Sequence, residues 1–155
     1  RRGRIAGYYR TFLSRTGVPA GLSHWERRMK AGWTFQRIEA GFLASNEYYT
    51  RNGRNDRAWI TSLYRTVLER EPTEPGLQYW LRQRRAGANR QAVAYRFVMC
   101  DQALAKLTNK RYREFINRDA HPIMQASWTR RMQSSYREEN LIGSLVSSTD
   151  YRARH

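Results

Sequence analysis

The sequence predicts an all-α fold: a tandem array of three helical repeats, each of about four short helices, that share a continuous core. Three observations lead to this prediction. A motif rich in Tyr, Arg, Gly and Trp recurs along the chain. Apolar residues fall three and four positions apart, which is the spacing of one face of an α-helix. No convincing run of alternating, β-branched residues is present, so strands are not needed.

The recurring motif sets the expected repeat boundaries. Its first copy reads Tyr9-Arg10-x-x-Leu13-x-Arg15, Gly21-Leu22-x-x-Trp25 and Gly32. The second aligns with the first without a gap and reads Tyr64-Arg65-x-x-Leu68-x-Arg70, Gly76-Leu77-x-x-Trp80 and Gly87. A third follows at a shorter offset, has Met124-Gln125 in place of Gly-Leu, and keeps Tyr112, Arg113, Ile116, Arg118 and Trp128. We therefore expect one domain over residues 1–155, with repeat 1 at about 5–53, repeat 2 at about 56–107 and a degenerate repeat 3 at about 109–155.

Repeat 1 contains the start and stop signals of four helices. Apolar spacing predicts the first helix over 5–15, and the break at 16–19 ends it. Pro19 suits the opening of the second helix and Gly32 its end. Thr34 and Ser45 are expected to cap the third and fourth helices, and Asn52-Gly53 to end the repeat.

Repeats 2 and 3 follow the same plan. In repeat 2 we expect a helix over 58–70, a second capped by Thr73 that stops near Gly87, and a third capped by Asn89. In repeat 3 we expect helices through Tyr112, from Pro122 and through Leu141, with Met124 among the inward-facing residues of the second. Cys100 lies in an apolar helical run, so we expect a buried structural thiol.

Two segments carry a resemblance to a known family. Gly76-Leu77-Gln78-Tyr79-Trp80 and Phe42-Leu43-Ala44-Ser45-Asn46-Glu47-Tyr48 resemble the pattern of the bacterial helical repeat family called domain of unknown function 4214. Repeat 2 departs from it with Cys100-Asp101-Gln102-Ala103 in place of Ser-x-Glu-Tyr. The family is distantly similar to the linker repeats of phycobilisomes, which are basic helical scaffolds. The resemblance implies a helical fold, no established catalytic residues, and an extracellular or cell-surface bacterial setting; no signal peptide is visible in this chain.

The charge of the chain is extreme. Twenty-nine Lys and Arg residues face 13 Asp and Glu residues, which gives a formal net charge of +16. Such a surface is expected to attract polyanions: nucleic acid, anionic cell-wall polymer or glycan, acidic protein or lipid headgroups. High Arg codon usage together with a need for solubility is an equal alternative.

One basic position recurs in all three repeats, two residues after the motif Trp. It is occupied by Arg27, Arg82 and Arg130, and Arg28, Arg85 and Arg131 lie beside it. If the repeats stack regularly, these residues form ladders that follow a phosphate or carboxylate polymer, each contact adding salt-dependent affinity. A solvated helix face is the alternative.

Three further sets have structural interpretations. The motif Trp residues are expected to pack in the core: Trp25, Trp80 and Trp128. An Arg that recurs at the end of each first helix is expected to bond the last helical carbonyls or to pair with Glu47 or Asp150: Arg15, Arg70 and Arg118. Two aromatics at one aligned position either stack on sugar or base or staple a helix start: Trp33 and Tyr136.

Catalysis has little support in this sequence. His24, His121 and His155 lack metal-ligand spacing, and no nucleophile elbow, Walker loop or dinucleotide-binding motif is present. We therefore expect no enzyme activity, no metal and no cofactor. The leading hypothesis is an interaction module that binds a protein partner or anionic polymer. Nucleic-acid binding through the aligned Arg rows is the alternative, and self-assembly through uncovered repeat ends is a third possibility.

Overall fold

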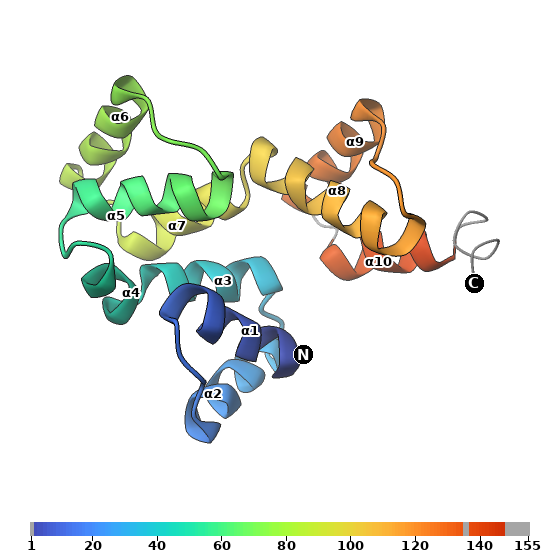
Figure 1. Cartoon of the computed structure of the whole chain (residues 1–155), viewed down its shortest axis with the longest axis horizontal. Helices are drawn as coiled ribbons and strands as arrows, with labels where there is room; N and C mark the ends of the chain where they lie inside the picture. Colours follow the sequence, from blue (N-terminus) through green and yellow to red (C-terminus); the bar gives the residue numbers. More distant parts are fainter. Residues whose placement is uncertain (1, 135–136, 148–155) are drawn as a thin grey trace. The chain divides into compact units, whose positions relative to one another are not determined.

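The structure is a computed structural model of the chain, and it describes residues 2–134 and 137–147. This part of the chain contains ten α-helices and one π-helical turn, and it has no strand (Figure 1). The all-α expectation is confirmed. The chain divides into two compact units, residues 1–98 and 99–155, which are described in turn. No helix in the described ranges combines the length and the apolarity needed to cross a bilayer.

The first half of unit 1 follows the expected order. Its helices are α1 (Arg2–Leu13), α2 (Pro19–Lys30), α3 (Phe35–Ala44) and α4 (Asn46–Arg51). Both expected caps are confirmed. The Oγ1 of Thr34 accepts from the backbone N–H of Arg37 at 3.1 Å, and the Oγ of Ser45 accepts from that of Tyr48 at 3.1 Å. These bonds satisfy N–H groups that a helix start leaves without partners.

The second half of unit 1 follows the order of α1, α2 and α3, with one change. Its elements are α5 (Asp56–Leu63), the π-helical turn η1 (Tyr64–Leu68), α6 (Glu74–Arg85) and α7 (Arg90–Val98). Thr73 and Asn89 are the expected caps, and they accept from the N–H groups of Gly76 at 3.2 Å and Ala92 at 2.8 Å. The helix expected over 58–70 begins earlier, because Asn55 caps it, and ends in η1 rather than in regular α-helix.

Aligned backbone turns recur even where the sequence has drifted. Ser14, Glu69 and Asn117 occupy the aligned position in the three copies of the sequence motif, and all three adopt the left-handed conformation, with φ of 52°, 55° and 62°. Gly32 and Gly87 likewise share φ values of 102° and 106°. A left-handed residue after a helix lets the chain turn away while its N–H bonds a helical carbonyl. The glycines accordingly end α2 and α6 as expected.

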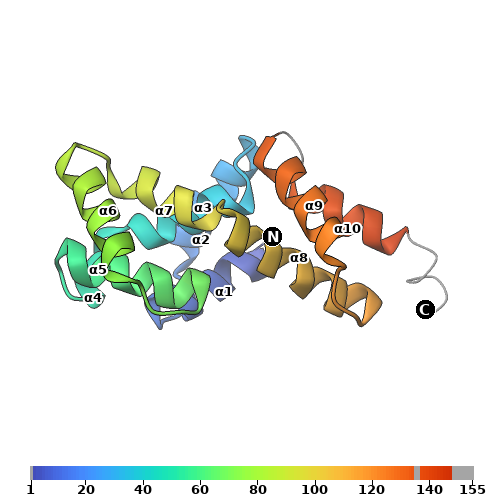
Figure 2. The same ribbon diagram turned by 90° about the horizontal axis from the view of Figure 1, so that it is seen from above.

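The core of unit 1 centres on α3 and α7, the aligned third helices of repeats 1 and 2. They pack side by side and antiparallel in Figures 1 and 2, and the guanidinium of Arg90 at the start of α7 bonds the carbonyl of Ala44 at the end of α3. Both helices bury apolar residues: Ile38, Phe42, Leu43, Val93, Phe97 and Val98.

Two equivalent aromatic clusters flank this helix pair. Trp25 stacks on Phe42 with ring centroids 4.8 Å apart, and Tyr9 meets the same ring edge-on at 4.8 Å. In the second repeat, the Trp80 ring lies 4.8 Å from that of Phe97, and the Tyr64 ring lies 5.0 Å from it. Aligned side chains thus make equivalent contacts in the two repeats.

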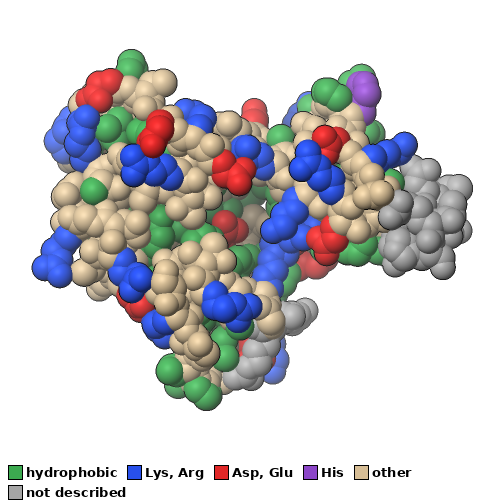
Figure 3. Space-filling model, viewed as in Figure 1, with side chains coloured by type: hydrophobic (Ala, Val, Ile, Leu, Met, Phe, Trp, Pro, Cys, Tyr) green, Lys and Arg blue, Asp and Glu red, His purple; other side chains and the backbone are tan. Residues whose placement is uncertain are grey.

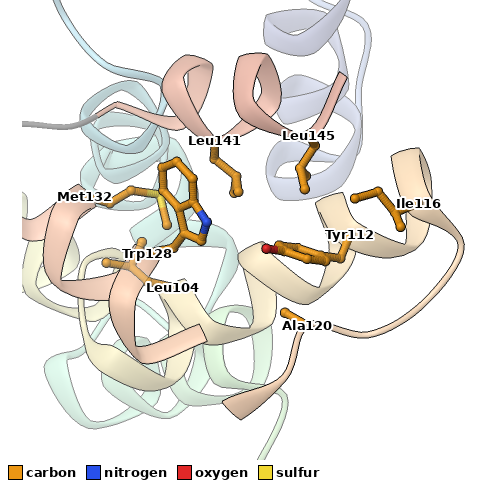
Figure 4. Close-up of a cluster of buried hydrophobic side chains, with 8 residues drawn as sticks. All are labelled: Leu104, Tyr112, Ile116, Ala120, Trp128, Met132, Leu141 and Leu145. Atoms are coloured by element: carbon orange, nitrogen blue, oxygen red, sulfur yellow. The ribbon is translucent and has the colours of Figure 1, made fainter. Parts of the chain in front are cut away.

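Unit 2 holds the third copy of the motif. Its helices are α8 (Asp101–Ile116), α9 (Pro122–Ser134) and α10 (Glu138–Val146). Figure 4 shows the side chains of its buried cluster converging from the three helices and the α8–α9 loop. They are Leu104, Tyr112, Ile116, Ala120, Trp128, Met132, Leu141 and Leu145.

Two expectations for residues 99–155 are wrong. Met124 is 39% exposed, because it lies in the first turn of α9, before Trp128 reaches the cluster. Cys100 is half-buried and caps α8, its Sγ accepting from the backbone N–H of Ala103 at 3.5 Å. Cys100 aligns with Ser45, so its thiol takes the place of the Ser hydroxyl rather than filling a core.

Helix α8 explains why the third copy of the motif follows at a shorter offset than the second. Where unit 1 has α4, a turn through Asn52-Gly53 and then α5, residues 101–116 form one continuous helix. No residues correspond to the turn or to the Asn55 cap. Without a cap or a turn residue, nothing interrupts the helix.

Candidate anion-binding surfaces

The aligned arginines predicted to bind an anionic partner lie on α2, α6 and α9. Arg27, Arg82, Arg85 and Arg130 are exposed, and none of them forms an ion pair with any residue that the structure describes. Exposed guanidinium groups of this kind are open to an external anion.

Arg28 and Arg131, the neighbours in this set, make contacts with other side chains of the chain. The Nε of Arg28 donates to His24 Nε2 at 3.1 Å, and its guanidinium lies 4.4 Å from the centre of the Trp33 ring. Arg131 lies 5.0 Å from the centre of the Trp128 ring. Burial lowers the pKa of His24, and the charges of Arg28 and Arg27 act in the same direction. The neutral imidazole that accepts from Arg28 is therefore the favoured form.

The arginines of α2 and α6 do not form one ladder. The two helices lie at opposite ends of unit 1, with the α3–α7 pair between them (Figure 1). Figure 3 shows Lys and Arg side chains scattered over the visible face of this unit, with isolated Asp and Glu among them. Unit 1 therefore presents separate basic patches, and Arg130 and Arg131 belong to unit 2.

Trp33 packs against arginines of its own repeat. The guanidinium carbon of Arg37 lies 3.7 Å from its ring centre and that of Arg28 lies 4.4 Å away. The half-buried ring therefore has intramolecular cation–π contacts. Tyr136, the other aromatic proposed for stacking, lies outside the described residues.

The arginine at the end of the first helix closes the repeat in unit 1. Arg15 forms a bidentate ion pair with Glu47, with N–O distances of 2.8 and 2.9 Å, and this is one of the two interactions expected from the sequence. Its guanidinium carbon also lies 4.9 Å from the centre of the Tyr9 ring. The hydrogen bond from Arg15 lowers the pKa of Glu47. Arg15 also donates to the carbonyl of Thr16 at 3.2 Å, which lies beyond the helix rather than in its last turn.

The remaining members of these structural sets are placed as follows. Arg70 repeats the stacking of Arg15, at 5.0 Å from the ring centre of Tyr64, and Arg118 is exposed. Asp150, its suggested partner, lies outside the described residues. Trp128 is buried as expected, whereas Trp25 and Trp80 are half-buried.

Unit 1 also contains a polar recess that was not predicted from the sequence. Its cavity of about 400 Å³ is lined by side chains and backbone from the end of α3 and from the connection between α6 and α7: Gly41, Ala44, Arg84, Asn89, Arg90 and Gln91. We call it the arginine recess. The aligned residues of repeat 1 are Met29 and Phe35 where repeat 2 has Arg84 and Arg90. That change from apolar to basic is visible in the alignment and is the signal that could have found the recess.

Protein acceptors hold both arginines of the recess. Arg84 donates from Nε to Asp56 Oδ1 at 3.2 Å and from Nη1 to the carbonyl of Ala88 at 2.9 Å. Arg90 donates from Nε to the carbonyl of Ala44 at 2.9 Å and from Nη2 to Asn46 Oδ1. Within the described ranges, no group of three or more His, Cys, Asp or Glu side chains is placed to hold a metal ion.

Comparison with protein families locates one known domain in this region. The protein-family model described as "Domain of unknown function (DUF4214)" matches residues 39–107 of the sequence. This segment belongs to the DUF4214 family. It runs from within α3 into α8 and contains all six residues that line the arginine recess. Comparisons with curated proteins and with solved structures found no match.

Proposed function

We propose that this chain is a non-enzymatic interaction module that binds an acidic protein partner or an anionic polymer through its exposed arginines. Three helical repeats of similar shape form the scaffold, and the parent protein is an exported or surface-associated bacterial protein. The location follows from the family resemblance, and the binding role follows from the surface described above.

The observation that supports this role best is the set of exposed arginines without ion-pair partners in the described ranges: Arg27, Arg82, Arg85 and Arg130. With a formal charge of +16, the chain has far fewer carboxylates than guanidinium groups to neutralise. An external polyanion supplies the missing charge and releases counterions on binding.

The separation of the basic patches favours a long or flexible ligand. Arg27 on α2 and Arg82 on α6 lie at opposite ends of unit 1, so a small compact anion reaches only one of them (Figure 1). An acidic polypeptide segment or an anionic polymer contacts several patches in turn. Linking several weak contacts raises the overall affinity without any single strong site.

A binding panel tests the proposal against its alternative. Duplex DNA, RNA, an anionic glycan and an acidic protein are titrated at near-physiological salt, since salt dependence alone is common to all polyanions. We expect binding to the acidic protein or the glycan. Preferential binding to DNA or RNA would instead favour the nucleic-acid alternative, and indifference to every member would remove the binding role.

Charge-reversal variants test which arginines bind. The triple change Arg27→Glu, Arg82→Glu and Arg130→Glu is expected to weaken partner binding while circular dichroism stays unchanged, because all three side chains are exposed. The matched control is Arg10→Glu, Arg51→Glu and Lys110→Glu, which reverses as many exposed charges on α1, α4 and α8. Equal losses in the two variants would mean that only net charge matters.

Self-association is tested separately by light scattering. We propose that chains associate through repeat faces that lack a neighbouring repeat. The apparent mass is expected to rise with concentration, and a constant monomer mass at high concentration would contradict this part of the proposal.

A further inference from the structure

We propose that the arginine recess is a docking site for a single carboxylate, supplied by an acidic side chain of the protein partner. This inference rests on the proposed function, and it assigns one partner group to one site. Four features of the recess support it: donors already held in place, an uncompensated positive charge, a depression large enough for an acidic side chain, and arginines that repeat 1 replaces with Met29 and Phe35.

The two guanidinium groups are fixed in place. Each bonds two protein acceptors, and each lies over an aromatic ring: Arg84 at 5.9 Å from the centre of Trp59, and Arg90 at 4.4 Å from that of Tyr49. The Nη2 of Arg84 and the Nη1 of Arg90 donate to no acceptor in the described part of the chain. Because these two donor groups are already held in place, they can bind both oxygens of a carboxylate with little further loss of side-chain conformational entropy.

The recess carries more positive than negative charge. Asp56 is the one carboxylate in ion-pair contact with either arginine among the described residues. The hydroxyl of Tyr49 donates to the same Asp56 Oδ1 at 2.9 Å. Burial, together with that hydrogen bond, raises the pKa of Tyr49, so its phenol stays neutral and supplies no second anion. Arg84 therefore has one carboxylate partner and Arg90 has none among the described residues, and an incoming carboxylate would complete the charge balance.

The dimensions and polarity of the recess suit an acidic side chain. The recess is an open surface depression of about 400 Å³, which is large enough to admit an Asp or Glu side chain. Asn89 uses its Oδ1 to cap α7, which leaves its NH₂ group as a donor. Gln91, the other amide of the lining, already donates from Nε2 to the carbonyl of Arg37 at 3.4 Å, so the available donors are those of Arg84, Asn89 and Arg90. All the assigned donors are N–H groups, which a carboxylate accepts from and a cation does not.

The repeat alignment supplies variants that respect the fold. Arg84→Met with Arg90→Phe installs the residues that repeat 1 carries at the aligned positions, Met29 and Phe35. The matched control is Arg10→Met with Arg51→Phe, which removes two exposed positive charges from α1 and α4 but touches neither the recess lining nor the arginines assigned to partner binding. Both variants have the same net charge and composition, so a difference between them reports on position.

The test titrates each variant with an acetylated, amidated hexaglutamate peptide at near-physiological salt, with the hexaglutamine peptide as blank. We expect the recess variant to lose about tenfold or more in affinity and the control to lose much less, because only the former removes two oriented, charged hydrogen-bond donors. Side-chain Nε–Hε resonances of Arg84 and Arg90 in the unmodified protein should shift with the peptide more than those of Arg10 and Arg51.

The outcomes separate this inference from the proposed function. If the unmodified protein binds no acidic ligand, both fail. If it binds the peptide but the recess and control variants lose affinity equally, or the Arg84 and Arg90 resonances stay fixed, the recess assignment fails and surface binding remains. The resonance measurement decides the matter even if the recess variant does not fold.

Discussion

Trp25 and Trp80 pack in equivalent places, but different neighbours complete their surroundings. A Cβ at Gly41 would lie 2.7 Å from the Cη2 of Trp25, so the missing side chain is what makes room for the indole ring. The aligned residue in repeat 2 is Arg96, whose guanidinium lies 4.8 Å from the ring centre of Trp80 and donates to the hydroxyl of Tyr79 at 2.8 Å. In repeat 1 the backbone at Gly41 approaches the indole ring closely, whereas in repeat 2 the guanidinium of Arg96 packs against the ring.

A single methyl group at Gly41 should therefore be costly. We expect Gly41→Ala to lower the free energy of unfolding by about 1–3 kcal/mol, because a rigid aromatic ring must move. Gly143→Ala is the matched control: its Cβ would meet nothing within 4 Å, and in the interior of α10 it should stabilise by about 0.4–1 kcal/mol. Urea unfolding measures both, and a neutral Gly41→Ala would contradict the close packing.

At the scale of elements, N-cap residues determine where helices begin. Cys100 is an unusual N-cap residue, because its acceptor is a thiol sulfur. We expect Cys100→Ser to keep or raise stability, because Ser is the residue that caps α4 at the aligned position. Cys100→Ala should cost about 0.5–1 kcal/mol, since it leaves the Ala103 N–H without its acceptor. Thermal unfolding of both variants measures the difference, and equal melting temperatures would show that the thiol does no capping.

The ion pair between Arg15 and Glu47 joins the end of α1 to α4 and should make stability depend on pH. The folded-state pKa of Glu47 is depressed, chiefly by the hydrogen bond from Arg15, so its contribution is present above the unfolded-state pKa of about 4.5. That contribution is lost as the pH falls through the folded-state value.

A double-mutant cycle isolates this contribution from other carboxylates. Unfolding of Arg15→Gln, Glu47→Gln and the double variant is compared at pH 7 and at pH 3. We expect a favourable coupling free energy between the two side chains at pH 7 and a smaller one at pH 3. The coupling should be modest at both pH values, because both side chains are more than a third exposed. A coupling that does not change with pH would contradict the assignment.

The sequence predicts elements well where the signal is local. Thr34, Ser45, Thr73 and Asn89 are recognisable as caps because capping depends on one side chain and the next few residues. The π-helical turn η1 is not predicted, because no local preference distinguishes it from α-helix. The apolar neighbours of Cys100 suggest a buried thiol, and that prediction is wrong although its alignment with Ser45 already indicates a cap.

At the scale of the whole molecule, the candidate site is the hardest part to foresee. The exposed arginines of α2, α6 and α9 are predictable one by one, but their separation in unit 1 depends on how α3 and α7 pair. The recess brings together Gly41, Arg84 and Arg90 from three helices, and Asp56 from a fourth helix pairs with Arg84. No spacing along the chain indicates such a meeting, so only the apolar-to-basic changes between repeats point to it.

The division of the chain gives a prediction about folding. We expect residues 1–98 to fold on their own, because the buried α3–α7 pair and both aromatic clusters lie within them. A fragment that stops at Asn55 should not fold, because truncation leaves α3 without α7. Helical circular dichroism and cooperative urea unfolding measure both fragments. A disordered 1–98 fragment, or a stable shorter one, would contradict the division.

The left-handed residues Ser14, Glu69 and Asn117 are positions at which substitution could increase thermal stability. None is glycine, so each holds a torsion that ordinary side chains resist, by about 1 kcal/mol. Glycine at Ser14 would relieve that resistance and is expected to raise the melting temperature in thermal unfolding. Asn117 stands to gain least, since Asn tolerates this torsion best among residues with a side chain. The most degenerate repeat has thus kept the least strained residue at this bend.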